Sequence, residues 1–341
     1  MSIICPRCES ENPSSLQYCD FCGYELRSEE SPSTVHAPVT LTDPDGSLLS
    51  ENGLSKTEPV TERGPFSEAE LWVALATFLN EHMEGFNVSD VHNIEETQHF
   101  WMDETLLDLS DSALKDLPEC IGLLSHLEFL DVSDNKFKKV PDVLRQLTDV
   151  RTLILWGNKL KTLPDWFAEL TLLKDLDISD NKFNEFPEVL CQLPRLRELD
   201  LSNNNLIELS DSIGNISLLE DLSISDNELT RLPDTLSKLK AVYELDVSFN
   251  KLKSLPSGFE TMTNIVSLDL DHNNIASLPE GLENWNQITY FSIKNNPIPP
   301  NDLPQNLSKL NGTGKRGLST VIWLVFLAFT LIPVLFTLFG F

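Results

Sequence analysis

Basic side chains are scarce in this sequence: 25 Lys and Arg residues stand against 53 Asp and Glu residues, so the formal net charge is -28. Nucleic-acid-binding proteins gain most of their affinity from Lys and Arg that neutralise phosphates, so we expect no nucleic-acid partner. The charge would also repel an anionic membrane surface, whereas it would attract a basic protein partner and speed its association. Simple solubility is the alternative explanation of the same charge.

Signals for secretion and for catalysis are missing as well. No apolar run opens the chain, so we expect no secretory signal peptide and a cytoplasmic location for the N-terminal part. The sequence holds no phosphate-binding glycine loop and no Ser-His-Asp constellation above chance. Cys120 and Cys191 have no nearby His or Asp in sequence to activate a thiolate. The chain is therefore predicted not to be an enzyme and to have no small-molecule substrate.

Four of the six cysteines lie within residues 1–26, as two CxxC pairs separated by ten residues: Cys5, Cys8, Cys19 and Cys22. In a reducing compartment such clustered cysteines are metal ligands more often than disulfides. Four thiolates suit tetrahedral Zn²⁺ and leave no open position for catalysis. The segment resembles a zinc-ribbon-like module that binds one structural Zn²⁺. It would serve either as a metal-dependent folding staple or as a docking site for another protein.

A polar linker and a helical segment follow the cysteine pairs. Residues 27–64 are rich in Ser, Pro, Thr and Glu, so we predict a disordered acidic linker. In residues 65–104, Ser67 and Glu70 fit a capping box. Leu71, Ala74, Leu75, Phe78 and Leu79 follow at helical spacing. We predict an amphipathic helix to about residue 83, within an N-terminal cap for the array that comes next.

Residues 105–300 repeat with a period of 23. The period is marked by a column of asparagines: Asn135, Asn158, Asn181, Asn204, Asn227, Asn250, Asn273 and Asn296. A second column holds proline in most repeats and Ser210 in one. Leu199 and Leu201 show the apolar pair of one short strand, whose side chains point to the same side. We expect stacked strands, a continuous apolar core and an inward-turned ladder of Asn side chains.

The pattern LxxLxLxxNxL followed by LPxxL resembles the leucine-rich-repeat family, in its 23-residue intracellular, Ras-suppressor-like class. The resemblance implies an α/β fold, a curved solenoid of nine repeats with a parallel sheet on the concave face. It also implies a protein-binding role. Regulation of small GTPases would follow from the resemblance alone.

Residues between the inward leucines are predicted to face the concave surface. The central column of this surface is acidic in six repeats: Asp108, Asp131, Asp177, Asp200, Asp246 and Asp269. Ile154 and Trp156 make one repeat apolar, and Phe249, His272 and Tyr290 add rings nearby. Our hypothesis is a partner with an apolar anchor on Ile154 and Trp156 and with basic groups along the Asp column. Alternatively, Trp156 merely covers an adjacent side chain, and Asp is simply a common residue at this position of such repeats.

The last segment, residues 318–341, contains no charged residue, and residues 301–317 are predicted to form a polar juxtamembrane stalk. As a helix, 24 residues span about 36 Å, enough for the roughly 30 Å hydrocarbon core. Lys309, Lys315 and Arg316 precede the span, which favours a cytoplasmic position for the bulk of the chain. We predict a single-pass, tail-anchored protein embedded in a lipid bilayer. The predicted function is a membrane-tethered protein-protein interaction scaffold; the alternative is a component or regulator of an enzyme complex, ubiquitin-ligase-like or acting on a small GTPase.

Overall fold

The computed structural model describes residues 2–4, 11–13, 67–83, 98 and 105–312 of the 341-residue chain. The four cysteines of the predicted zinc module, the linker and the predicted membrane span at 318–341 lie outside the described residues. At the N-terminus, β1 (Ser2–Ile4) pairs antiparallel with β2 (Glu11–Pro13), with Ile3 opposite Asn12. Cys5 and Cys8 lie between these two strands in sequence.

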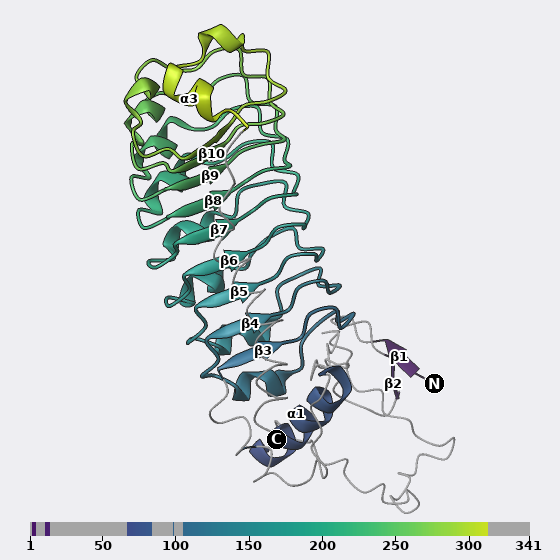
Figure 1. Ribbon diagram of the computed structural model, residues 1–341. Coiled ribbons are helices and arrows are strands. Elements are labelled where there is room, and N and C mark those ends of the chain that lie inside the picture. The colour runs from purple at the N-terminus through teal and green to yellow at the C-terminus, as the bar shows by residue number, and fades with distance from the viewer. Residues whose placement is uncertain (1, 5–10, 14–66, 84–97, 99–104, 313–341) are drawn as a thin grey trace, which may run out of the picture. The chain divides into compact units, whose positions relative to one another are not determined.

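Residues 105–312 form a stack of coils, and each coil contributes one three-residue strand to a single parallel sheet (Figure 1). The strand order, β11-β10-β9-β8-β7-β6-β5-β4-β3, follows the chain without a crossover. The strands are β3 (Leu106–Asp108), β4 (Phe129–Asp131), β5 (Thr152–Ile154), β6 (Asp175–Asp177), β7 (Glu198–Asp200), β8 (Asp221–Ser223), β9 (Glu244–Asp246), β10 (Ser267–Asp269) and β11 (Tyr290–Ser292). Paired residues are 23 apart, as in Asp177↔Asp200, so the predicted repeat and its parallel sheet are confirmed.

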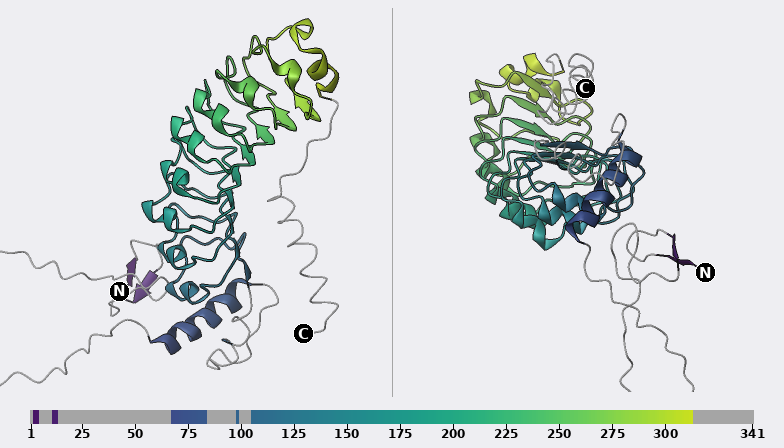
Figure 2. Two further views of the ribbon diagram at one scale, coloured as in Figure 1. Left: turned by 90° about the vertical axis from the view of Figure 1, so that its left-hand side faces the viewer. Right: turned by 90° about the horizontal axis from the view of Figure 1, so that it is seen from below.

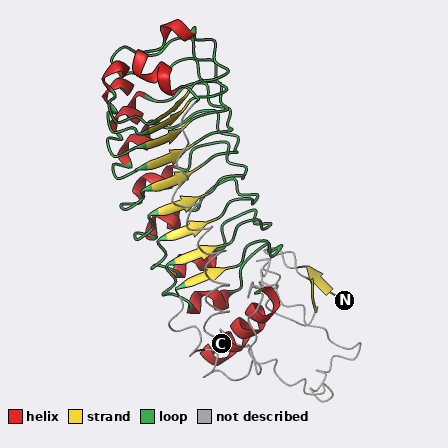
Figure 3. Ribbon diagram, viewed as in Figure 1, coloured by secondary structure: helices red, strands yellow, loops and turns green. Residues whose placement is uncertain are grey.

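Short 3₁₀ helices line the side of the stack opposite the strands (Figure 3). They are η1 (Glu119–Leu123), η2 (Asp142–Gln146), η3 (Asp165–Glu169), η4 (Glu188–Gln192), η5 (Asp211–Asn215), η6 (Asp234–Lys238), η7 (Phe259–Thr261) and η8 (Leu282–Asn284). In η1–η4 and η6 the residue before the helix is the repeated proline, which fixes φ where no backbone donor is needed. Ser210 takes that position at η5, and its side chain accepts a hydrogen bond from the Ser212 backbone N–H.

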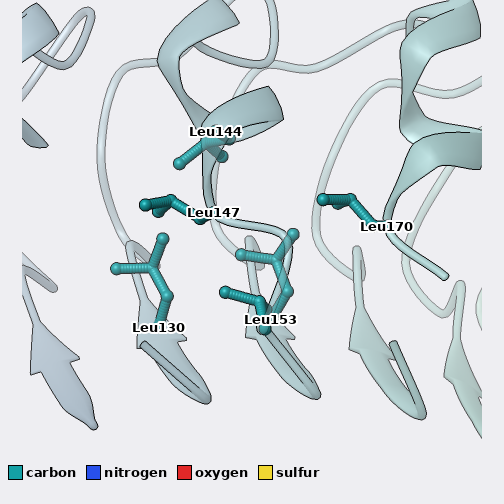
Figure 4. A pocket seen from close by; sticks show the side chains of 6 residues that line it. Leu130, Leu144, Leu147, Leu153 and Leu170 are labelled. Carbon is teal, nitrogen blue, oxygen red and sulfur yellow. The ribbon is translucent and has the colours of Figure 1, made fainter. Parts of the chain in front are cut away.

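The apolar core runs through the middle of the stack. The central residue of each strand β3–β11 is at most 2% exposed, because it points inward while its neighbours point to the other side of the sheet. Between the second and third coils, Leu130, Leu144, Leu147, Val150, Leu153 and Leu170 surround a gap with no room for a water molecule (Figure 4). The interior is therefore packed core and not a ligand cavity at this point.

The asparagine column forms the predicted ladder, and Asn204 shows its pattern. Its side-chain oxygen accepts from the Phe183 N–H of the preceding coil at 3.0 Å. Its amide group lies 3.1 Å from the carbonyl oxygens of Ile178, Leu201 and Ser202. Each such Asn therefore ties its own turn to the coil before it.

Helix α1 (Glu68–His82) begins with the predicted capping box. The Ser67 backbone N–H donates to Glu70 at 2.8 Å, and the Glu70 N–H donates to the Ser67 hydroxyl at 3.3 Å. The predicted apolar face needs one correction: Ala74 is exposed, whereas Trp72 and Ala76 are buried with Leu75. The buried stripe is thus rotated slightly from the predicted one, because the large Trp72 takes the inward position.

The C-terminal end of the stack differs from the predicted stalk. Residues 300–312 contain η9 (Pro300–Asp302) and helix α3 (Gln305–Leu310), whose Leu307 is fully buried. The Asn311 side chain accepts from the Ile293 N–H, and the Gly312 N–H donates to the Phe291 carbonyl. Residues 301–312 are therefore a cap on β11 and not a free polar stalk, because the last strand needs partners for its open edge. Among the residues the structure describes, no helix is long and apolar enough to cross a membrane.

Candidate functional site

The outward positions of the sheet, β3–β11, form one continuous surface, which we call the sheet face. Each coil contributes the first and third residue of its strand and the second residue after the strand. Neighbouring strands lie about 4.8 Å apart, so equivalent side chains form rows along the stack. Figure 2 shows the strands on one side of the coils and the 3₁₀ helices on the other.

The predicted Asp column has a structural role in every coil where it occurs. One carboxylate oxygen of each Asp accepts the backbone N–H of the residue two positions later, at 2.8–3.0 Å in every case; the six are Asp108, Asp131, Asp177, Asp200, Asp246 and Asp269. This bond closes the turn that follows the strand. Aspartate at this position is therefore explained in part by turn chemistry.

Two carboxyl groups flank Ile154 on the adjacent strands, and both are perturbed. Burial raises the pKa of Asp131 to about 6, with smaller contributions from Asp108 and Asp134. Burial also raises the pKa of Asp177 to about 7, helped by the neighbouring Asp200 carboxylate. An apolar neighbour gives a carboxylate no hydration and no counter-charge, which favours its neutral form.

Ile154 itself does not present the exposed apolar surface that the sequence predicted. Its side chain is 0% exposed, and Trp156 is half-buried. The strand register places Ile154 directly between Asp131 and Asp177. Of the predicted apolar pair, Trp156 is therefore the residue with surface to offer, while Ile154 packs beneath its neighbours.

Sequence reasoning missed a second acidic row on the same surface. The first residues of four consecutive strands are acidic: Asp175, Glu198, Asp221 and Glu244. They lie two residues before the Asp column, so they point to the same side of the sheet. The signal was present in the 23-residue period, because these four positions align as the other columns do.

At the carboxyl ends of the strands, Phe249 and His272 form a stacked pair with ring centroids 4.1 Å apart. Phe249 is 47% exposed, and the side chain of Asn295 lies 2.8 Å from the ring of His272. All three residues have positive φ, at 51°, 54° and 55°. The same turn position holds Asp, Asn or Gly in the earlier coils, so Phe249 keeps an unfavourable backbone conformation for a bulky residue.

Tyr290 of β11 closes the acidic surface at its last strand. Its hydroxyl donates to the Asp269 carboxylate at 3.0 Å, and the Ser292 hydroxyl donates to Asp271 at 2.6 Å. Burial, followed by the charge of Asp269, raises the pKa of Tyr290 to about 12. Tyr290 and Asp269 are thus brought together as partners of each other, whereas the sequence had placed both against a ligand.

The two thiols within the repeats are unsuited to nucleophilic chemistry. Cys120 is buried, which raises the pKa of its thiol to about 12. Cys191 is half-buried, its Sγ lies 3.2 Å from the Ser212 carbonyl oxygen, and burial raises its pKa as well. The described part of the chain contains no group of three or more His, Cys, Asp or Glu side chains able to hold a metal ion. Cys5, Cys8, Cys19 and Cys22 are outside that part.

Comparisons with known proteins agree with the coil geometry. A family model described as leucine-rich repeat region matches residues 84–210, and one described as leucine rich repeat matches residues 240–298. No curated protein matches the chain. A solved leucine-rich-repeat protein of Leptospira interrogans is 29% identical with a TM-score of 0.52. The match covers 62% of this chain and 60% of that protein, so this chain spans less than two thirds of it.

A plant receptor is similar to this chain as well. It is the leucine-rich-repeat ectodomain of the membrane receptor kinase GASSHO1/SCHENGEN3 from Arabidopsis thaliana, solved in complex with CASPARIAN STRIP INTEGRITY FACTOR 2. Identity is 28% and the TM-score 0.51, over 56% of this chain and 24% of the receptor chain. The match thus covers about half of this chain and about a quarter of the receptor chain.

Proposed function

Because this chain is a leucine-rich-repeat protein, we propose that it is a non-enzymatic scaffold that binds a protein partner on its sheet face. Stacked repeats of this kind provide an extended concave surface suited to protein binding. The site, rather than the fold, must carry the functional argument. Here the site is the sheet face, the outward side chains over β3–β11.

The carrying observation is the concentration of charge on that face. The first and third residues of the strands are Asp or Glu at nearly every position from β6 to β9. Equivalent carboxylates on neighbouring strands lie about 4.8 Å apart and repel one another. A basic protein surface would relieve that repulsion. The similar plant receptor was solved with a bound factor, which supports a partner-binding role for coils of this kind.

The proposed scaffold has two further parts, which rest on the sequence. Residues 318–341 would anchor it in a lipid bilayer with the bulk of the chain on the cytoplasmic side. Cys5, Cys8, Cys19 and Cys22 would bind one structural Zn²⁺ next to the hairpin β1–β2, whose two strands enclose the first CxxC pair in sequence. Binding of Zn²⁺ by the four thiolates would supply the folding free energy that so short a segment lacks.

Site-directed photo-crosslinking tests the binding face. A photoreactive amino acid is placed at Ser225 on the sheet face and, in a matched variant, at Lys238 in η6 of the same coil. We expect full-length protein in solubilised membranes of the source cells to crosslink one specific protein from position 225 and not from position 238.

Substitution of Trp156 provides the second arm. Trp156→Asp should abolish the crosslink from position 225 while the circular dichroism spectrum stays that of the wild type. Equal crosslinking from both positions, or an unchanged crosslink in the folded Trp156→Asp protein, would show that the sheet face is not the binding site.

Extraction of membranes with alkaline carbonate tests the anchor separately. Full-length protein should remain in the pellet, and a variant truncated after residue 312, where the cap of β11 ends, should be released. Release of both proteins would show that residues 318–341 do not anchor the chain in a membrane, and the proposed scaffold function would be unaffected.

A further inference from the structure

The sheet face is not uniform along the stack. From β6 to β9, seven of its eight strand-end positions carry carboxylates: Asp175, Asp177, Glu198, Asp200, Asp221, Glu244 and Asp246. We call these residues the acidic segment. Among the outward positions of β3–β11, all of which the structure describes, Lys294 after β11 is the one cation. Negative charge is thus concentrated on four adjacent strands.

The negative charge of the acidic segment shifts the pKa of a neighbouring side chain. The pKa of Tyr243 is raised by burial first and then by the carboxylates of Asp221, Glu198 and Glu244. Tyr243 lies just before β9, so several carboxylates of the acidic segment act on one point. On the other flank, the Thr152 hydroxyl donates to Asp175 at 2.8 Å, and Lys174 lowers the pKa of Asp175 against the dominant effect of burial.

Apolar side chains gather on β3–β5, beside Asp108 and Asp131 of the Asp column. Leu106 begins β3, Phe129 begins β4, and Ile154 ends β5 with Trp156 two residues beyond it. Leu106, Phe129 and Trp156 are half-buried, and Ile154 is fully buried. We call these four residues the apolar segment. It meets the acidic segment directly, because β5 pairs with β6.

We propose that the sheet face binds one extended polypeptide segment in a fixed orientation, with Lys or Arg residues over the acidic segment and an aromatic or large aliphatic residue against Trp156. This inference rests on the proposed function and names its partner's chemistry. The distance from β5 to β9 is about 19 Å, four strand spacings of about 4.8 Å, which roughly six residues of extended chain span. Nucleic acid would be repelled by the acidic segment, and a small cation would leave the apolar segment unused.

The experiment uses full-length protein in a nonionic detergent and three synthetic peptides of equal length. One peptide carries a terminal Trp and four Lys residues, the second has Ala in place of Trp, and the third has acetyl-lysine in place of Lys. Affinities are measured by fluorescence anisotropy at two salt concentrations. Because the contacts combine charge and apolar area, we expect the affinity of the first peptide to be the highest and to fall as salt rises.

Two charge-matched variants locate the basic contacts. Glu198→Gln, Asp200→Asn and Glu244→Gln together neutralise three carboxylates of the acidic segment. Asp165→Asn, Glu185→Gln and Asp211→Asn together neutralise three carboxylates elsewhere on the coils. The first variant should bind both Lys peptides about tenfold more weakly, a loss typical of close charge pairs, and the second should stay within about twofold of the wild type. Equal losses in the two variants would overturn the proposal, because net charge alone would then explain the binding.

Trp156→Ala locates the apolar contact and fixes the orientation. It should weaken the Trp peptide about fivefold, as expected for loss of a partly exposed aromatic contact, and leave the Ala peptide unchanged. An equal effect on both peptides would overturn the proposed orientation. If neither Lys peptide binds the sheet face while position 225 still crosslinks a protein, the inference fails and the proposed function stands.

Discussion

Truncation of one ladder asparagine, Asn204→Ala, gives the sharpest test of how the coils hold together. Asn204 is 8% exposed, and the methyl group of Ala can form none of its bonds. The buried Phe183 N–H would lose its acceptor, which costs about 1–3 kcal/mol. The carbonyls of Ile178 and Leu201 would each keep one amide donor, from Asn181 and Asn227, so the lost donations cost only about 1 kcal/mol each.

The sum predicts a loss of about 3–5 kcal/mol in the free energy of unfolding, to be measured by urea titration monitored by circular dichroism. The chain offers two matched controls on either side of Asn204. Asn205→Ala removes an exposed side chain and keeps the backbone bond of its N–H to Phe183, so it should change stability by less than about 0.5 kcal/mol. Asn203→Ala should cost about 1 kcal/mol, because its φ of 50° lies in the left-handed region, which Asn tolerates better than Ala. If Asn204→Ala costs no more than Asn205→Ala, the ladder is not what joins the coils.

Three other predictions concern a carboxyl group, a strained turn and the zinc module. The raised pKa of Asp131, about 6, keeps its proton bound in the folded state between about pH 4 and 6, so the free energy of unfolding should fall as pH rises through that window. Asp131→Asn should therefore be more stable than the wild type by about 1–3 kcal/mol at pH 8 and equally stable at pH 4. Parallel pH profiles of the urea midpoint for the two proteins would contradict this. Phe249→Asn should change stability by less than about 1 kcal/mol, because Asn suits the positive φ of that turn, whereas Phe249→Val should lose at least that much; equal melting temperatures for the two variants would argue against backbone strain. The full-length protein should contain one Zn²⁺ by elemental analysis, and Cys5→Ser should lower that content below one half; full zinc content in the variant would remove Cys5 from the ligand set.

The repeat stack was predictable from sequence because one period determines several structural features together. The Asn, Leu and Pro columns each recur every 23 residues, and each has one physical reason to do so: a turn donor and acceptor, core packing and a fixed φ. The strand register and the inward Asn ladder were correct for that reason. The capping box was correct because Ser67 and Glu70 form a local motif with a fixed spacing of three residues.

The site was harder to predict, because sequence columns show direction but not depth. Ile154 points to the predicted side yet is fully buried, which depends on the neighbours supplied by β4 and β6. The acidic row of Glu198 and Asp221 was not predicted, because the same position holds Leu, Phe or Thr in the first three coils and the column is therefore not uniform. The cap formed by α3 was read as a stalk, since its six residues are too few to give a helical period.

The ladder bonds also bear on the mechanics of the stack. Each Asn reaches back 21 residues with its oxygen and 26 with its amide, so a coil is bonded to the one before it and to none farther away. Such an assembly can bend through small changes in the angle at every junction between neighbouring coils. A ligand lying across β5–β9 would restrict the bending at several of these junctions at once. Its arrival would then be detectable far from any contact, as slower amide exchange in the 3₁₀ helices on the opposite side.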